Sequence, residues 1–202
     1  MSDDTARRAA IFTDIWRQHI WGGAESRSGP GSGVARTAPL RAALEALLER
    51  EQPQVFYDAP CGDFLWMSHV RLPARTLYIG SDIVAPLIAD NEARYGAPGR
   101  TFHVADIVAE PPPAADVWLC RESLFHMPFA DAQRVIAHWR GSAIPIFLAT
   151  TTPTIICNHD IDTGDWRPLN LEIAPFDLGP PSEYLPDAAP ADPAKRIGVW
   201  RR

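Results

Sequence analysis

Between residues 54 and 152 the chain alternates short apolar runs with amphipathic segments. Segments of helical period lie at 85–96 and 129–140, and the stretch CGDFLWMSHV after the first apolar run can also start a helix. Strands of a parallel sheet covered on both faces are apolar along their length, and helices connect them. The pattern therefore predicts an α/β fold with a mostly parallel sheet and helices on both faces. The apolar runs expected to be strands are residues 54–60, 76–83, 101–107, 115–123 and 143–152.

The two ends of the chain do not follow this alternation of apolar runs and amphipathic segments. Apolar residues at helical spacing predict a helix over residues 3–20, capped by Asp3 or Asp4, and a second helix over 38–50. Gly and Ser dominate residues 21–33, which on composition alone would be a flexible linker. Prolines recur through the last third of the chain, so we expect loops and short strands there, with a final strand at 196–202.

Length and composition exclude several classes of protein. The chain has 202 residues, which fits one domain, and a net charge of −6 with scattered arginines, so we expect no nucleic-acid partner. No apolar run reaches the ~18 residues of a membrane span, so we expect no membrane partner. The three cysteines form no CxxC pair, so they indicate neither a zinc site nor a redox couple. They are odd in number and far apart in the sequence, which fits the reduced cytoplasm. Neither His159 with its acidic neighbours nor any other group has the spacing of a zinc or calcium site, so no metal is expected.

Polar residues follow four of the predicted strands. In an open parallel sheet, ligands bind beyond the carboxyl ends of the strands, so these residues are expected to share one rim. Gly62 permits close approach of the backbone to a ligand, and a following helix N-terminus would attract an anion. Asp82 can accept both hydroxyls of a ribose, and Asp106 can accept from an exocyclic amine such as that of adenine. The polar segments are 58–63, Asp82, Asp106 and 120–122.

The same segments carry a family resemblance. Residues 58–63 (DAPCGD) resemble the D-x-G-C-G-x-G loop of class I S-adenosylmethionine (SAM)-dependent methyltransferases. Residues 78–83 (YIGSDI), 104–107 (VADI) and 119–126 (LCRESLFH) resemble the motifs of the next three strands, in order and at proper spacing. Departures are Pro60 and Phe64 in place of two glycines, and Glu122 in place of the commoner Asp. Residues 21–32 and the TGDWRPLNL segment (163–171) resemble the flanks of a small bacterial subgroup.

The resemblance implies a Rossmann-like, seven-stranded sheet and one methyltransferase domain over residues 1–202. Within it, 1–50 would supply N-terminal helices and a cover, 51–152 the SAM-binding core, and 153–202 acceptor-side loops and last strands. The implied activity moves a methyl group from SAM to oxygen or nitrogen of a small molecule, with a sugar or natural product as the preferred acceptor. A non-catalytic SAM-binding or partner-binding protein is an alternative. Another Rossmann-like nucleotide-binding enzyme is a second one, although G-x-G-x-x-G and P-loop strings are absent.

Individual residues receive roles from the same resemblance. Asp58 and the 60–62 backbone would hold the methionine part of SAM, Asp82 the ribose, and Asp106 the adenine amine. His126 is the candidate base. Acceptor-binding candidates are Glu122, Asp160, Trp166, Arg167 and Asn170. The cofactor-binding candidates are Trp21, Arg27, Ser28, Asp58, Pro60, Cys61, Gly62, Asp63, Asp82, Ile83, Asp106, Ile107 and Arg121.

Each role has a structural alternative. Asp63 could cap the following segment, His126 could be a hydrogen-bonded structural histidine, and Arg121 could simply pair with Glu122. Residues 21–32 could be linker, and 160–170 a surface loop. The tryptophans Trp16, Trp139 and Trp200 are expected to pack in the core rather than to touch cofactor.

Overall fold

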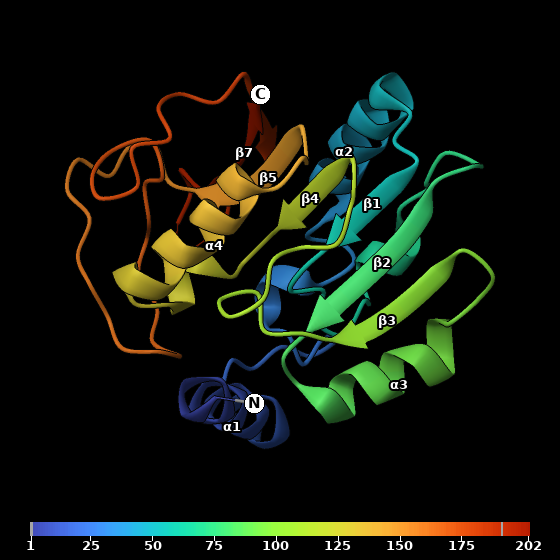
Figure 1. Cartoon of the computed structure of the whole chain (residues 1–202), viewed down its shortest axis with the longest axis horizontal. Helices are drawn as coiled ribbons and strands as arrows, with labels where there is room; N and C mark the ends of the chain where they lie inside the picture. The colour runs from blue at the N-terminus through green and yellow to red at the C-terminus, as the bar shows by residue number, and fades with distance from the viewer. Residues whose placement is uncertain (1, 191) are drawn as a thin grey trace.

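One seven-stranded sheet organises the chain (Figure 1). A computed structural model describes residues 2–190 and 192–202. The strand order is β3-β2-β1-β4-β5-β7-β6, and β1 to β5 are parallel, whereas β7 runs antiparallel to both of its neighbours. The predicted α/β, Rossmann-like fold with a mostly parallel sheet is therefore confirmed. The strands are β1 (Val55–Asp58), β2 (Leu77–Asp82), β3 (Arg100–Val104), β4 (Val117–Cys120), β5 (Ile146–Thr151), β6 (Glu183–Pro186) and β7 (Arg196–Arg201).

Helices cover both faces of the sheet, and alternate strand residues divide the core between them. Phe56 packs on the side of α2 (Ala38–Glu51) and α3 (Ala85–Tyr95), whereas its neighbour Tyr57 packs on the side of α4 (Phe129–Gly141). Figure 1 shows α4 in front of the sheet and α2 behind it. Proline in the first turn begins α2 and α3, where no backbone N–H is needed.

The helix α1 (Asp3–Gln18) lies beyond the carboxyl ends of the central strands (Figure 1). Its N-cap is Ser2, whose hydroxyl accepts from the backbone N–H of Thr5 at 3.2 Å. The expectation that Asp3 or Asp4 caps this helix is wrong. Both acids lie in the first helical turn, where their charge favours the positive end of the helix dipole.

No α-helix follows β1, contrary to the prediction for residues 61–70. This stretch contains only a short 3₁₀ helix, η2 (Met67–His69). Phe64 has φ of 58°, a left-handed conformation that ends regular structure, and its ring packs edge-on against Tyr78, Tyr95 and Phe102. The expected helix N-terminus is therefore not available to bind an anion here.

Loops and short strands make up the last third of the chain, as predicted. Residues 152–182 contain no helix or strand, and β6 and β7 then complete the sheet edge. Among the helices of the described residues, none has the length and apolar character needed to cross a membrane.

Candidate functional site

A cavity opens at the carboxyl ends of β1, β2, β3 and β4, with an empty volume of about 1000 Å³ including its open mouth. All of the residues that sequence reasoning assigned to cofactor binding line it, from Trp21 to Arg121, and so do Glu122 and His126. The topology therefore brings four sequence segments and the 21–33 loop to one place.

The glycine-containing turn after β1 is fastened to the 21–33 loop. Gly62 has φ of 54°, and a Cβ at this position would clash with Oγ of Ser28. The backbone N–H of Asp63 donates to that same hydroxyl at 2.9 Å. The Asp63 carboxylate accepts from the hydroxyl of Ser26 at 2.7 Å and from the backbone N–H of Arg27 at 2.9 Å. Asp63 thus ties residues 21–33 across the cavity, and its contact with a cofactor stays a prediction.

Two buried carboxyl groups end β1 and β2. Asp58 accepts a hydrogen bond of 2.6 Å from the hydroxyl of Tyr78, and burial raises its pKa to about 7. Asp82 accepts from the backbone N–H of Val84 at 3.0 Å and of Gly62 at 3.2 Å, one bond on each oxygen, and burial raises its pKa to about 6. Because a carboxylate oxygen has two lone pairs, both oxygens of Asp82 can still accept from a ligand.

Asp106, after β3, has a charged partner that sequence reasoning missed. The guanidinium of Arg8, on α1, donates to its Oδ2 through Nε at 3.1 Å and Nη2 at 2.6 Å. The other oxygen, Oδ1, accepts from the backbone N–H of Val108 at 3.0 Å. Both Arg8 and Asp106 are buried and both line the cavity.

One face of α1 forms a wall of the cavity. Phe12 and Trp16 line it together with Arg8. Trp16 is partly buried and packs against the hydrophobic core, as predicted. It also lines the cavity, where the guanidinium of Arg27 stacks 5.2 Å from its ring centroid, and a contact of Trp16 with a cofactor is a proposal. The spacing of Arg8, Phe12 and Trp16, four residues apart, places them on one helix face and is the signal that could have found them.

His126 ends the 3₁₀ helix η3 (Leu124–His126), which follows β4. Its Nδ1 lies 2.6 Å from the carbonyl oxygen of Asp165. A carbonyl can only accept, so Nδ1 carries the proton and Nε2 of the neutral ring keeps a lone pair. The ring stacks on Trp21 with 4.5 Å between centroids, and burial lowers its pKa to about 4. His126 is thus neutral at neutral pH and lines the cavity, and its Nε2 makes no hydrogen bond to the residues that the structure describes.

Arg121 and Glu122 follow β4 and form ion pairs with Asp187 and Lys195, near the C-terminus. Arg121 pairs with Asp187 at 2.7 Å and donates to the carbonyl of Gly31 at 2.8 Å. Glu122 has φ of 53°, a strained conformation for this residue, and its carboxylate binds Lys195. Arg121 and Glu122 also approach each other at 3.8 Å, but both have closer partners. Asp187 and Lys195 carried no sequence signal as site residues.

Four acceptor-binding candidates lie outside this cavity. Asp160 accepts the first backbone N–H of α4, from Phe129, at 2.7 Å. The Asn170 amide donates to the carbonyls of Pro153 and Ile155, and Trp166 is half exposed. The buried Arg167 donates to the carbonyl of Met127 at 2.7 Å and stacks on a phenylalanine ring. The contacts of Asp160, Arg167 and Asn170 are of the kind that order a loop, and an acceptor role for the four remains a prediction.

Comparisons with known proteins identify a shared fold. No protein-family model matches the chain, and no curated protein matches its sequence.

Several solved structures are similar to the chain. One is a Burkholderia thailandensis 1,6-didemethyltoxoflavin-N1-methyltransferase, solved with 1,6-didemethyltoxoflavin and S-adenosylhomocysteine (SAH). Its TM-score is 0.68 at 18% sequence identity, and the match covers 98% of this chain and 89% of that one. PigF with SAH has a TM-score of 0.61 at 14% identity, covering 82% of this chain. The chain spans only 55% of PigF's length. The N-terminal domain of EvdMO1, solved in the presence of SAH and D-fucose, has a TM-score of 0.59 at 12% identity, covering 81% and 83%. The chain shares the fold of these proteins.

Proposed function

We propose that this chain binds SAM in the cavity at the carboxyl ends of β1 to β4 and transfers its methyl group to oxygen or nitrogen of a small molecule. One observation carries the proposal. Residues that the sequence resemblance assigns to SAM, scattered from Trp21 to Arg121, all line a single cavity. The three similar structures, each solved with SAH, support the same cofactor.

The lining residues fit the parts of SAM. Asp82 would take the ribose hydroxyls on its two remaining lone pairs, and Asp58 would face the ammonium of the methionine part. Ile83 and Ile107 would flank the adenine, beside Asp106. Gly62 has no Cβ, and a Cβ at this position would clash with the hydroxyl of Ser28, another lining residue of the cavity. When bound, SAM supplies a methyl group made electrophilic by its sulfonium.

The chain's own residues would then orient the acceptor and move its proton. His126 is neutral, and its Nε2 would accept a hydrogen bond from a hydroxyl of the small molecule. Because burial lowers its pKa to about 4, the ring would take the proton only as the methyl group is transferred, when the hydroxyl becomes strongly acidic. Glu122, held in place by Lys195, would accept a hydrogen bond from the small molecule that receives the methyl group. This bond would align the reacting atom of that molecule with the methyl group of SAM. Trp21 and the apolar face of α1 would exclude water from the reacting groups.

A sugar or natural-product acceptor is the finer part of the proposal. Carboxylate, imidazole and indole groups meet at the β4 side of the cavity, a combination that suits a hydroxylated molecule. The likeness to a protein solved with SAH and D-fucose agrees with it. We further propose that residues 1–202 act as one methyltransferase domain in the cytoplasm, in keeping with the free state of Cys61, Cys120 and Cys157.

Calorimetric titration of the purified protein with SAH, SAM and NAD tests the proposal. We expect SAH and SAM to bind and NAD not to, and labelled SAM to pass its methyl group into a small-molecule fraction of a cell extract. Binding of NAD without any response to SAM or SAH would indicate a different nucleotide-binding enzyme. SAM binding without methyl transfer to any fraction would leave a non-catalytic SAM-binding protein.

A further inference from the structure

Arg8 is an unusual residue to bury on the first helix of the chain. Only Thr5, Arg8 and Ile15 are buried on α1, and Arg8 keeps 5% of its surface exposed. Removing a guanidinium from water is costly unless its partners compensate for it. Two do so: Asp106 at 2.6 Å, and Asp131, in the first turn of α4, at 3.4 Å. A helix that needed only to pack would place an apolar side chain here.

The ion pair leaves one part of Asp106 free. Nε and Nη2 of Arg8 bind the same oxygen, Oδ2, whereas Nη1 binds Asp131. Among the described residues, the second oxygen, Oδ1, accepts only from the backbone N–H of Val108 and so keeps one lone pair. Arg8 therefore fixes the orientation of the Asp106 carboxylate, and one lone pair of Oδ1 stays available as a hydrogen-bond acceptor for a ligand. Ile107 beside it offers an apolar surface for a flat ring.

We infer that Arg8 is a positioning residue that aims Asp106 Oδ1 at the amino group of the cofactor's adenine, so that α1 takes part in selecting the base. The inference rests on the proposed function. An amino group donates to the remaining lone pair. The 6-oxo group of a hypoxanthine base would instead set an acceptor against an acceptor, and a site built around a hydrogen bond rejects such an analogue.

The same geometry links the base to the docking of α1. Arg8 joins the helix to β3 and α4, and Phe12 and Trp16 extend the contact along the cavity. Because linkage is reciprocal, a ligand that needs the Arg8–Asp106 pair must also stabilise α1 in its docked position. SAH is therefore expected to protect the backbone amides of α1 from hydrogen exchange.

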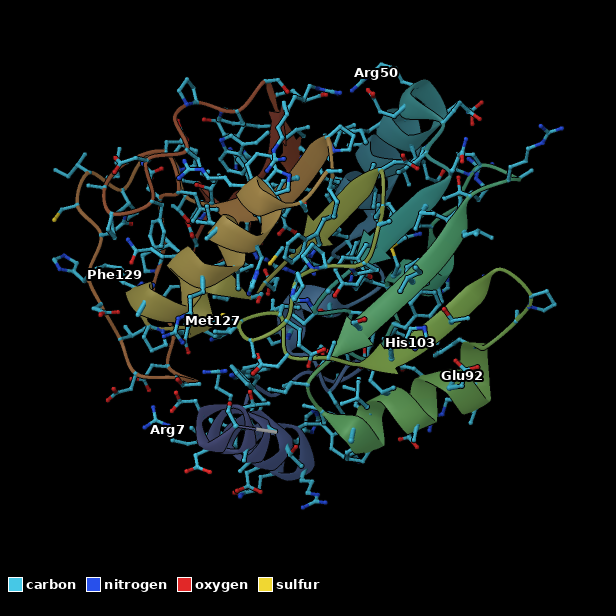
Figure 2. The ribbon with its side chains drawn as sticks, viewed as in Figure 1. Arg7, Arg50, Glu92, His103, Met127 and Phe129 are labelled. Carbon is cyan, nitrogen blue, oxygen red and sulfur yellow. The ribbon has the colours of Figure 1, made fainter. Side chains whose placement is uncertain are left out.

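Calorimetry with two ligands, SAH and S-inosylhomocysteine, tests the selection of the base. The wild-type protein should prefer SAH by roughly 10- to 100-fold, the value of one hydrogen bond to a charged group. Arg8→Met should lose most of this preference, and Arg8→Lys should restore part of it. Arg7→Met is the matched control, because Arg7 is the adjacent exposed arginine and points away from the sheet (Figure 2). Its preference should equal that of the wild type.

The outcomes separate the inference from the proposed function. A wild-type protein that binds neither ligand overturns both. A wild-type protein that binds SAH, with an Arg8→Met variant that keeps the same preference, overturns the inference alone and makes Arg8 merely structural. Where Arg8→Met does not fold, hydrogen exchange on the wild type decides. Added SAH should slow exchange in residues 5–16, and unchanged exchange there contradicts the inference.

Discussion

The cavity has two ends that are built in different ways. The proposed cofactor end consists of Asp58, Gly62, Asp82 and Asp106, at the ends of β1, β2 and β3. Apart from the pair with Arg8, the side chains of these three acids accept hydrogen bonds from residues no more than 20 positions away in the sequence. The proposed acceptor end consists of Glu122 and His126, next in the chain to the cofactor-binding candidate Arg121. The partners of Arg121, Glu122 and His126 are Asp187, Lys195 and Asp165, which lie 66, 73 and 39 residues further along the chain.

This difference separates what the fold supplies from what the loops supply. A parallel sheet brings every strand's carboxyl end to one edge, so the cofactor end follows from topology. The acceptor end depends on how the chain returns to the sheet after β5, and residues 152–182 contain no helix or strand. Loops on a rigid scaffold change without disturbing it, so we expect acceptor choice to reside here.

The largest expected effect is at the acceptor end, with His126→Gln. Glutamine keeps the size and polarity of the side chain but cannot take a proton, so turnover should fall by roughly 10²-fold or more. SAH affinity should stay near wild type, because His126 belongs to the other end of the cavity. Initial rates of methyl transfer from labelled SAM, together with calorimetry, check both expectations.

The control for this variant is His69→Gln, at an exposed histidine in η2. It should match the wild type in rate and affinity. Near-normal turnover in His126→Gln would make His126 a structural residue that orders the 163–167 segment through Asp165. The acceptor end would then contain no catalytic base, and the two ends would differ only in how their residues are held.

Much of the fold was predictable because the strands are short, apolar and regularly spaced. Each predicted run overlaps one observed strand, and the helices at 38–50, 85–96 and 129–140 are confirmed within two residues. The error after β1 has a specific cause. Phe64 reads as an ordinary apolar residue, but its backbone is left-handed and its ring packs edge-on against Tyr78 and Phe102. Local sequence carries no sign of these tertiary contacts.

The clustering of the cofactor-binding candidates at one edge of the sheet was also predictable, whereas the partners of Arg121 and Glu122 were not. A glycine or an acid after a strand signals a ligand by its position. Lys195 and Asp187 carry no such signal, because their importance comes from pairing across 66 residues or more. Arg8 was missed for a related reason: a charged residue on an amphipathic helix is ordinarily solvated, and its burial depends on where the helix docks.

An intermediate effect is expected at the cofactor end, with Asp82→Asn. The variant should lose about 1–3 kcal/mol of SAH affinity, because a neutral amide replaces a charged acceptor. Calorimetry measures the loss, and Asp90→Asn, at an exposed acid on α3, is the control. Unchanged affinity in Asp82→Asn would move the ribose contact elsewhere.

The pH dependence of binding sharpens the same test. Burial raises the pKa of Asp82 to about 6 and that of Asp58 to about 7, so both carboxylates gain protons as the pH falls from 8 to 5. SAH affinity should fall over this range, since the protonated groups lose the charge that favours hydroxyl and ammonium donors. Asp82→Asn should make the fall shallower and shift its midpoint toward 7, because only Asp58 still titrates. Affinity independent of pH would contradict a role for either group.

The smallest effect is expected from Asp160→Ala, and it tests where the acceptor end stops. Asp160 accepts the first N–H of α4, so its loss should lower the free energy of unfolding by about 1 kcal/mol, as for other helix caps. Thermal denaturation measures this change, and Asp162→Ala, at a neighbouring exposed acid, should leave stability unaltered. Methyl transfer should be normal in both variants. A large rate defect in Asp160→Ala with normal stability would instead make Asp160 an acceptor contact, as its sequence position suggests, and would extend the acceptor end beyond the cavity into the 160–170 loop.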